Sequence, residues 1–242
     1  MSKIAIVIPT YNPSALLMKT LADLNDDPCI AGMNKVVVND GSTNGLNFLQ
    51  QVASDQSFFL IQLKTNRGKG AAIKEAIRYI LSQGWPVEFL VTVDSDGQHL
   101  AKDVSRVIES ASQNTTAIHV GSRRLEKDKT PWRSFFGNFF SRMLFSCLYG
   151  SELKDTQSGL RAYPKHFFPT LLSLQSDRYD FEMEAIIRAM QSKVCIAETQ
   201  IDTVYLMQNK SSHFRPFLDS YRVLRVMAKT RFKHSASARH KA

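Results

Sequence analysis

Short apolar runs alternate with helix-like runs through the first half of this chain. Five runs rich in β-branched residues occur in order, at 3–9, 35–40, 58–63, 87–94 and 116–122. Stretches with helical character separate them, at 14–25, 46–54, 69–83 and 101–113. Strands that alternate with helices in this way form βαβ units with parallel strands. The pattern therefore predicts an α/β fold, with a mostly parallel sheet flanked by helices.

The second half of the chain is less regular. We expect an aromatic-rich helix at 134–149, a helix near 181–191 and a strand near 195–204. A last helix is expected from about 214 to 232, with Pro216 in its first turn. Its apolar residues recur at helical spacing, and basic residues lie to one side of that stripe. This pattern predicts an amphipathic, basic helix near the C-terminus.

The net charge of +9 is concentrated at the C-terminal end of the 242 residues. Residues 208–242 hold nine Lys or Arg residues against Asp219 alone, so the preceding residues are nearly neutral. We therefore expect one α/β domain over 1–207, followed by a basic helix and a disordered tail over 208–242. A basic amphipathic segment of this kind favours contact with an anionic partner such as a membrane surface.

Apolar patterning and cysteine content indicate the compartment. No uncharged apolar run is long enough to span a bilayer, and the N-terminus lacks the features of a signal peptide. The three cysteines are Cys29, Cys147 and Cys195. Their odd number and wide spacing predict reduced, buried thiols in a cytoplasmic protein.

Residues 89–99, FLVTVDSDGQH, place two carboxylates at the end of an apolar strand. Asp94 and Asp96 at this spacing could share a hard divalent cation through their oxygens. The stretch fits three interpretations: a phosphatase nucleophile motif, the DxD motif of nucleotide-sugar glycosyltransferases, or a solvated turn. The phosphatase motif has Thr where Gln98 stands, and it occurs at the start of the chain in that class.

Further motifs accompany this one in a fixed order. They are IAIVIPTYN (4–12), VVVNDGS (36–42), TNRGKGAAI (65–73), VGSRR (120–124), DTQSGLRAY (155–163), FEMEAI (181–186) and SHFRPFLDSYRVLR (212–225). Together they resemble family 2 glycosyltransferases of GT-A fold over roughly residues 3–226. The resemblance is strongest to the dolichyl-phosphate mannosyltransferase-like branch, which includes bacterial polyprenyl-phosphate glycosyltransferases.

The resemblance implies a nucleotide-sugar donor site at the ends of the early strands. The implied donor-binding residues are Pro9, Thr10, Tyr11, Asp40, Arg67, Lys69, Asp94, Ser95 and Asp96. In this scheme Tyr11 lies beside the base, Asp40 accepts a hydrogen bond from it, and Arg67 and Lys69 lie near the diphosphate. An ordinary loop at a helix N-terminus is the alternative for that last pair.

The resemblance also implies a divalent metal, Mg²⁺ or Mn²⁺, held by Asp94, Asp96 and Gln98 against the diphosphate. His99 follows directly and could assist the metal, although a loop residue is its more ordinary role. Together with Asp155, the two acids form the implied catalytic set.

On the acceptor side, the resemblance implies Arg123, Arg133, Ser158 and Arg161 as binding residues. A guanidinium fork suits a phosphate through paired hydrogen bonds. Because a phosphate acceptor is already ionised, it needs no general base. A hydroxyl acceptor needs one, and Asp155 or Glu182 is then the candidate. The alternative for Glu182 is a helix residue that pairs with a nearby cation. A plain turn leading into a strand is the alternative for residues 155–163.

Three positions depart from the family pattern. Asn39 replaces the first acid of the usual DDGS motif, and Pro13 stands where the family often has Glu. Phe136 and Gly137 stand where a Ser is expected one turn after the acceptor arginine. If the missing acid only orders its loop, Asn39 preserves that role.

We therefore expect an inverting, metal-dependent glycosyltransferase that moves a sugar from a nucleoside-diphosphate sugar to a polyprenyl phosphate or another lipid-linked acceptor. We expect a cytoplasmic protein in peripheral contact with the membrane through the helix at 214–232. The helix at 134–149 would either belong to the core or insert shallowly into the membrane surface. Transfer to a hydroxyl is the alternative. Two more distant alternatives are a haloacid-dehalogenase-type phosphatase and a nucleic-acid-binding module. We expect no nucleic-acid partner.

Overall fold

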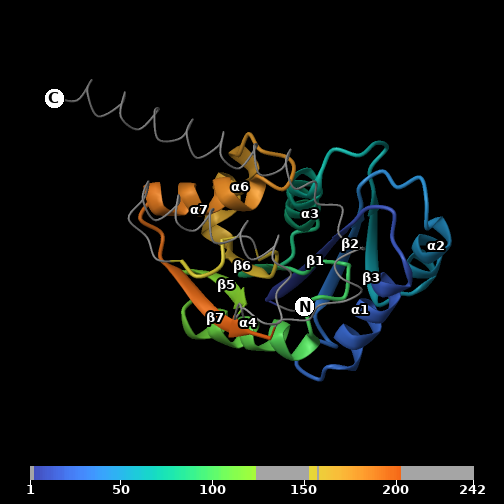
Figure 1. The fold of residues 1–242 in the computed structure, drawn as a ribbon, viewed down its shortest axis with the longest axis horizontal. Helices are drawn as coiled ribbons and strands as arrows, with labels where there is room; N and C mark the ends of the chain where they lie inside the picture. Colours follow the sequence, from blue (N-terminus) through green and yellow to red (C-terminus); the bar gives the residue numbers. More distant parts are fainter. Residues whose placement is uncertain (1–2, 124–152, 157, 203–242) are drawn as a thin grey trace, which may run out of the picture.

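The computed structural model describes residues 3–123, 153–156 and 158–202 (Figure 1). The strands of this part are β1 (Ile4–Thr10), β2 (Asn34–Asn39), β3 (Phe58–Gln62), β4 (Phe89–Thr92), β5 (Ile118–Arg123), β6 (Arg161–Pro164) and β7 (Ile196–Ile201). The helices are α1 (Ala15–Asp26), α2 (Leu46–Ser54), α3 (Lys69–Ser82), α4 (Ala101–Gln113), the 3-10 helix η1 (Lys165–Phe167), α6 (Phe168–Ser173) and α7 (Phe181–Gln191). The strands and helices predicted for the first half are all present, with bounds within two residues of the prediction.

The strands form one seven-stranded sheet in the order β3-β2-β1-β4-β6-β5-β7. Only β6 is antiparallel to its neighbours, β4 and β5, and the other neighbouring pairs are parallel. The mostly parallel sheet is therefore confirmed. The stretch 155–163 leads into β6, which begins at Arg161, and its predicted role in acceptor binding stays a prediction. A four-residue strand paired with strands distant in sequence has too little periodicity to be recognised locally.

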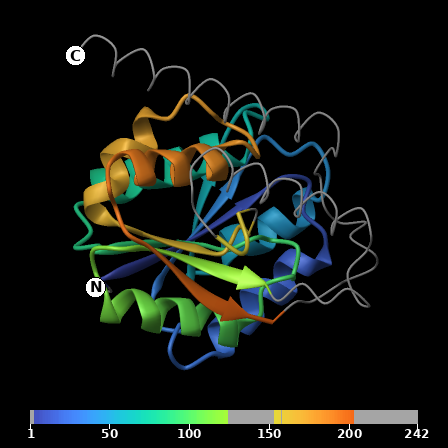
Figure 2. The ribbon, with the colours of Figure 1, turned by 60° about the vertical axis from the view of Figure 1, so that its left-hand side comes forward.

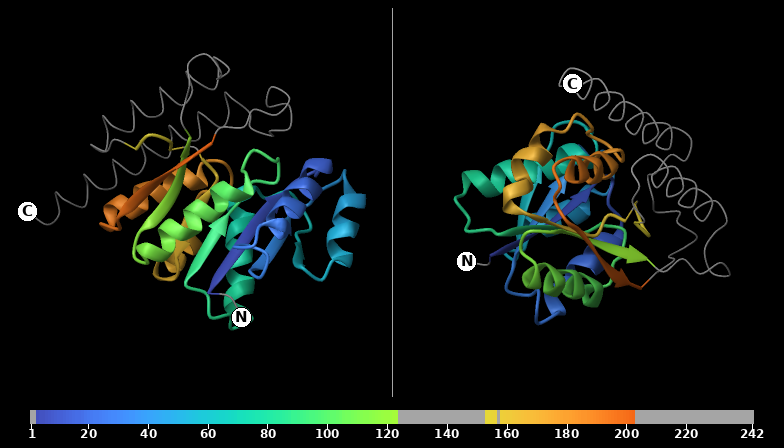
Figure 3. Two further views of the ribbon diagram at one scale, coloured as in Figure 1. Left: turned by 90° about the horizontal axis from the view of Figure 1, so that it is seen from below. Right: turned by 90° about the vertical axis from the view of Figure 1, so that its left-hand side faces the viewer.

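Two hydrophobic cores cover the two faces of the sheet. Alternate residues of a strand point to opposite faces, so Ala5 and Val7 of β1 pack with α3, α6 and α7. Ile6 and Ile8 of the same strand pack on the other face with α1 and α4. The three layers are seen in Figure 2 and in the right panel of Figure 3. Because both faces are covered, the central strands are continuously apolar until their carboxyl ends.

The loops that follow those carboxyl ends are ordered by side chains that accept hydrogen bonds from loop N–H groups. Asn12, in the left-handed region at φ 49°, accepts hydrogen bonds from the backbone N–H groups of Thr43 and Asn44. Asn39 accepts one from the N–H of Ser42 at 2.9 Å. Asn39 therefore orders its own loop. An amide can fill this role as well as the acid that the family usually has at this position.

The second half of the chain docks onto α3. Lys74 Nζ donates to the carbonyl oxygens of Leu174 and Ser176 at 2.7 and 3.0 Å, and to Asp177 Oδ1 at 2.7 Å. Four residues earlier, a Cβ added to Gly70 would lie 2.7 Å from the Cβ of Phe181. The absence of a side chain at Gly70 thus lets the first turns of α3 and α7 meet.

Several predictions concern residues outside the described ranges. These are Arg133, the helices expected at 134–149 and 214–232, and the basic region 208–242. Within the described ranges, no helix is long and apolar enough to cross a membrane.

The cysteine prediction needs a correction. Cys29 and Cys195 are free thiols, as expected, but they are exposed rather than buried. Both lie in connecting segments, before β2 and before β7, where their apolar neighbours pack inward without them.

Replacing Lys74 with Met should lower the free energy of unfolding by about 2–4 kcal/mol, because two buried carbonyl groups and a carboxylate lose their donor. Urea denaturation followed by circular dichroism measures this loss. Lys19→Met, at an exposed position of α1, is the matched control and should change stability by less than about 0.5 kcal/mol. Equal effects of the two changes would contradict the docking role.

Candidate active site

The paired carboxylates lie just beyond the end of β4. Asp94 and Asp96 are both partly exposed, and Gly97 between Asp96 and Gln98 has φ 77°. This turn lets the N–H of Gln98 donate to Asp96 Oδ1 at 3.1 Å. The parallel strands β1 and β2 end at the same edge, where α/β sheets bind ligands. The geometry therefore presents both acids toward the ligand-binding edge.

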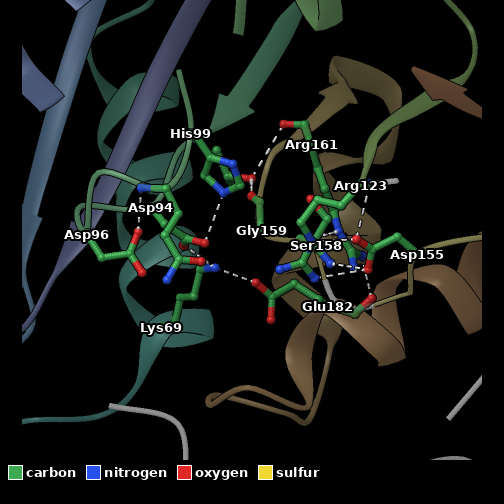
Figure 4. Close-up of polar contacts among 12 residues, drawn as sticks. Lys69, Asp94, Asp96, His99, Arg123, Asp155, Ser158, Gly159, Arg161 and Glu182 are labelled. Carbon is green, nitrogen blue, oxygen red and sulfur yellow. Dashed lines mark hydrogen bonds and ion pairs between the residues drawn. The ribbon is translucent and has the colours of Figure 1, made fainter. Parts of the chain in front are cut away.

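Lys69 links the acids to the second half of the chain. Its Nζ lies 2.5 Å from Asp94 Oδ1 and 2.6 Å from Glu182 Oε1 (Figure 4). The side chains of Lys69 and Glu182 are 13% and 8% exposed, whereas that of Asp94 is 30% exposed. Lys69 is the first residue of α3 and Glu182 lies in the first turn of α7. One ammonium group thus bridges two carboxylates from distant parts of the sequence.

His99 holds the other oxygen of Asp94. Its Nε2 lies 3.1 Å from Asp94 Oδ2, and the ring is buried. Nδ1 of the same ring is buried and has no hydrogen-bond partner within the part of the chain that the structure describes. Asp94 is therefore oriented from both sides, by Lys69 and by His99.

These contacts shift the pKa values of the two acids in opposite directions. Burial alone would raise the pKa of Asp94, but Lys69 and His99 outweigh it and hold that pKa well below its usual range. Burial, together with the charge of Asp94, raises the pKa of Asp96. Burial alone would lower the pKa of Lys69, but the two carboxylates outweigh it and raise that pKa. Asp94 is consequently paired, while Asp96 carries a charge that a bound cation would stabilise.

Gly159 packs directly against this pair. A Cβ at Gly159 would lie 2.5 Å from Lys69 Nζ and would also collide with Asp94 Oδ2. The carbonyl oxygen of Gly159 accepts a hydrogen bond from Thr92 Oγ1 at 2.7 Å. The loop before β6 can approach the acids this closely only because it has glycine at this position.

The residues predicted to bind the nucleoside surround the ends of β1 and β2. Pro9 and Thr10 are buried within β1, whereas Tyr11 and Ser95 are partly exposed beside the edge. Thr10 Oγ1 is buried, with no hydrogen-bond partner among the described residues. Their contacts with a nucleotide stay predictions.

Asp40 has a contact that the sequence did not predict. Its two carboxylate oxygens accept hydrogen bonds from the N–H groups of Arg67 and Gly68, at 2.8 and 2.7 Å. Burial raises the pKa of Asp40, although these two N–H groups favour its ionised form. Asp40 therefore orders the loop that leads into α3 and brings the exposed Arg67 to the edge. Its predicted contact with the base stays a prediction.

Arg123 and Asp155 form an ion pair on the acceptor side. Arg123 Nε lies 2.6 Å from Asp155 Oδ2, and Nη2 lies 3.2 Å from Oδ1. The Asp155 side chain is fully buried, whereas that of Arg123 is 28% exposed. The N–H of Ser158 also donates to Asp155 Oδ1, at 3.0 Å. Asp155 thus holds both the predicted phosphate-binding arginine and the loop of Ser158.

Arg161 has structural contacts that the sequence did not predict. Its side chain is fully buried. Its guanidinium group donates to the carbonyl oxygens of Ser158, Glu182 and Thr156, at 2.8, 2.7 and 2.9 Å. Arg161 is the first residue of β6, and its contacts join the loop before β6 to the first turn of α7. Its predicted contact with the acceptor stays a prediction.

Sequence reasoning placed Lys69 near Asp94 and Asp96, and the structure joins Lys69 to Asp94. It offered Glu182 either as a base or as a helix residue paired with a nearby cation, and the structure shows the pair, with Lys69 as the cation. It missed how Gly159 and His99 contact Asp94. The glycine in the DTQSGLRAY motif was the available signal for the first of these. The contact of Glu182 with Lys69 has no local signal, since 113 residues separate them.

The donor set fits a divalent cation that shares its ligands with a substrate. Among the described residues, no group of three or more His, Cys, Asp or Glu side chains is arranged to hold a metal ion by itself. Mg²⁺ typically binds one or two carboxylates together with substrate phosphates. Asp94 and Asp96 supply that part of a coordination sphere, and Gln98 lies next to them.

A mostly parallel α/β sheet with paired acids and a lysine at its carboxyl edge is the arrangement expected of a GT-A glycosyltransferase. The model of the family "Glycosyl transferase family 2" matches residues 5–170. The chain therefore belongs to the family 2 glycosyltransferases, as its motifs indicated, and this decides against the phosphatase interpretation.

Two curated relatives and one solved structure illustrate the similarity. The UDP-N-acetylglucosamine–dolichyl-phosphate N-acetylglucosaminyltransferase of Methanococcus voltae is 27% identical over 220 residues, covering 84% of this chain and 86% of the relative. The undecaprenyl-phosphate mannosyltransferase of Micrococcus luteus is 28% identical over 213 residues, covering 84% of each. Glucosyl-3-phosphoglycerate synthase from Mycobacterium tuberculosis, crystallised with Mn²⁺, UDP and glucosyl-3-phosphoglycerate, has a TM-score of 0.70 at 16% identity. That match covers 94% of this chain and 79% of the synthase, and it confirms the fold.

Replacing Arg161 with Met should lower the free energy of unfolding by about 3–5 kcal/mol, because three buried carbonyl groups lose their donor. Guanidinium denaturation measures the loss. Arg78→Met, at a half-exposed arginine of α3, should cost about 0.5 kcal/mol or less. Wild-type stability combined with impaired acceptor use would restore the original prediction for Arg161.

Proposed function

We propose that this glycosyltransferase transfers a sugar from a nucleoside-diphosphate sugar to a lipid-linked phosphate, with a divalent cation and with inversion at the anomeric carbon. The observation that carries the proposal is the pair Asp94 and Asp96, held at the sheet edge beside Lys69. The acids suit a cation and the lysine suits a diphosphate. Both belong in a site that stabilises a departing nucleoside diphosphate.

On the donor side, we propose that the nucleoside lies over the ends of β1 and β2. Tyr11 is partly exposed there and offers a ring beside the base, while Pro9, Thr10 and Ser95 shape the surrounding surface. Arg67 is exposed near the N-terminus of α3, where the helix dipole favours negative charge. These features support binding of an anionic nucleotide.

Departure of the diphosphate requires positive charge near its oxygens. When bound, Mg²⁺ or Mn²⁺ supplies that charge, and Asp94, Asp96 and Gln98 would hold it. Lys69 adds a second positive charge that reaches the same place from α3. The solved neighbour that was crystallised with Mn²⁺ and UDP supports a divalent cation in this fold.

On the acceptor side, we propose that Arg123, which is 28% exposed, holds the phosphate, with Arg133 as a second arginine. Ser158 is buried in the loop before β6, and its predicted contact with the acceptor stays a prediction. The relatives named for dolichyl-phosphate and undecaprenyl-phosphate support an acceptor of this class. Asp155 and Glu182, the two candidate bases, are engaged in ion pairs with Arg123 and Lys69. A phosphate is already ionised at neutral pH and needs neither of them.

In the reaction, an oxygen of the acceptor phosphate attacks the anomeric carbon and forms the new glycosidic bond. The bond from that carbon to the donor diphosphate breaks, and the electron pair leaves with the nucleoside diphosphate. Attack opposite the leaving group inverts the configuration. Asp94 and Lys69 lie on the leaving-group side, while Arg123 lies across from them, beyond Gly159 (Figure 4).

We propose that the transfer takes place at the cytoplasmic face of a membrane, because a lipid-linked acceptor lies there. The basic region 208–242 would contribute peripheral contact to the catalytic domain at 1–207. Anionic lipids attract such clusters of Lys and Arg.

Replacing Asp96 with Asn should reduce cation-dependent nucleotide binding by tenfold or more, an effect of about 1.4 kcal/mol or greater, because a charged ligand of the cation is lost. Calorimetric titration of UDP, GDP and CDP with and without Mn²⁺ measures this effect and identifies the nucleoside. Asp55→Asn, at an exposed surface position, is the matched control. The proposal would be refuted if the wild-type protein bound none of these nucleotides in the presence of Mn²⁺ or Mg²⁺.

Replacing Asp155 with Asn separates the two kinds of acceptor. With a phosphate acceptor, the loosened Arg123 should raise the acceptor KM by about tenfold, a loss of roughly 1.4 kcal/mol, while kcat changes little and the shape of the pH profile is preserved. With a hydroxyl acceptor, loss of a general base should lower kcat by about 10²–10⁴-fold and remove the fall in rate at low pH, because that fall comes from protonation of the base. Steady-state kinetics with a short-chain polyprenyl phosphate and with the matching polyprenol decide between these outcomes.

A further inference from the structure

Lys69 contacts the carboxylate of Asp94, which is a proposed ligand of the cation. Its ammonium group lies 2.5 Å from Asp94 Oδ1, and His99 contacts the other oxygen of the same carboxylate. Both oxygens of Asp94 therefore have positively polarised partners before any ligand arrives. A divalent cation that binds Asp94 must share an oxygen with one of them or displace it.

We propose that Lys69 is an internal substitute for the cation, holding Asp94 while the site is empty and moving to the diphosphate when donor and cation bind together. The inference rests on the proposed function and adds to it an order of events at the same site. It makes Lys69 a positioning residue toward the cation in addition to its predicted contact with the diphosphate.

Charge supports this exchange. Lys69 pairs with Asp94 and Glu182, and Asp96 lies two residues from Asp94. When all three carboxylates are ionised, the single ammonium group leaves two negative charges uncompensated. A divalent cation matches that deficit, but it would meet the ammonium group at Asp94 Oδ1. Like charges sharing one carboxylate oxygen repel each other, and the repulsion falls when a diphosphate offers the ammonium group another anion.

The form of the lysine side chain suits such a movement. An ammonium group on a flexible four-carbon stem can change partners without the fixed geometry that a guanidinium fork demands. The backbone of Lys69 stays in place, because Gly68 before it is held by Asp40 and Gly70 after it packs on Phe181. Movement is therefore confined to the side chain.

Glu182 supplies the stationary partner. Its side chain is 8% exposed, and its carbonyl oxygen accepts a hydrogen bond from the buried Arg161 at 2.7 Å. This hydrogen bond holds the backbone of Glu182 in place. Lys69 can release Asp94 and stay paired with Glu182, so the shift leaves neither the ammonium group nor Glu182 unpaired.

One consequence is cooperative binding. The cation alone must compete with Lys69 and should bind weakly, whereas the cation with a nucleoside diphosphate should bind tightly. A nucleoside monophosphate, with fewer phosphate oxygens for Lys69, should promote the exchange less. The site would thus respond to the diphosphate that distinguishes the donor.

The test measures Mn²⁺ affinity without nucleotide, by electron paramagnetic resonance of the free ion, using the full-length protein. Lys69→Met should tighten Mn²⁺ binding by about tenfold, because the competing ammonium group is gone. Glu182→Gln should weaken it by about fivefold, because Lys69 then has Asp94 as its remaining partner and the site loses a negative charge. Lys64→Met removes an exposed charge five residues away and is the matched control for long-range electrostatics.

A second measurement addresses coupling between the ligands. The factor by which UDP, or whichever diphosphate binds the wild type, tightens Mn²⁺ binding should fall by about tenfold in Lys69→Met. In Lys64→Met it should be unchanged. Because Lys69→Met leaves two buried carboxylates without their cation, the double variant Lys69→Met/Glu182→Gln is measured as well. It should bind Mn²⁺ more tightly than Glu182→Gln alone.

The outcomes separate this inference from the proposed function. If the wild-type protein binds a diphosphate with Mn²⁺, but Lys69→Met changes neither the Mn²⁺ affinity nor the coupling more than Lys64→Met does, Lys69 is no substitute cation and the proposed function stands. Tighter Mn²⁺ binding with reduced coupling supports the exchange. If the wild type binds no diphosphate with any cation, the proposed function fails first.

Discussion

The contact of Lys69 with Asp94 and Glu182 is the interaction on which the rest of the site depends. Carboxylates brought together in a partly buried place are costly unless a cation compensates them. The ammonium group provides this compensation, and it joins the end of β4 to the first turn of α7. Glycines at 70 and 159 make the approach possible, because a side chain at either position would collide with α7 or with the acids.

Buried polar side chains hold the loops around the site, at both its predicted donor end and its predicted acceptor end. Asn12, Asn39 and Asp40 accept hydrogen bonds from loop N–H groups at the donor end. At the predicted acceptor end, Arg161 donates hydrogen bonds to carbonyl oxygens of the loop before β6. Asp155 accepts a hydrogen bond from Arg123 and so holds its side chain. Loops at the carboxyl ends of strands carry many polar backbone groups that need partners. Residues that would be read from sequence as ligand contacts here serve partly to satisfy that need.

Family membership and local geometry answer different questions about this chain. The family model and the motifs assign glycosyl transfer, whereas the geometry assigns work to individual side chains. Arg161 is the clearest case, because the resemblance places it among acceptor contacts and the fold buries it completely. Asp155 is similar, since its carboxylate holds Arg123. A residue can therefore belong to a functional motif through its effect on a neighbour.

The sequence by itself determined the alternating strands and helices, the parallel sheet and the acids at its edge. Those features follow from local periodicity and from turn residues that act within a few positions. Only the tertiary structure decided that β6 enters antiparallel between β4 and β5, that Glu182 meets Lys69, and that Arg161 is buried. Each of these is a pairing between segments far apart in the chain. Such contacts depend on packing in three dimensions, which local patterns do not encode.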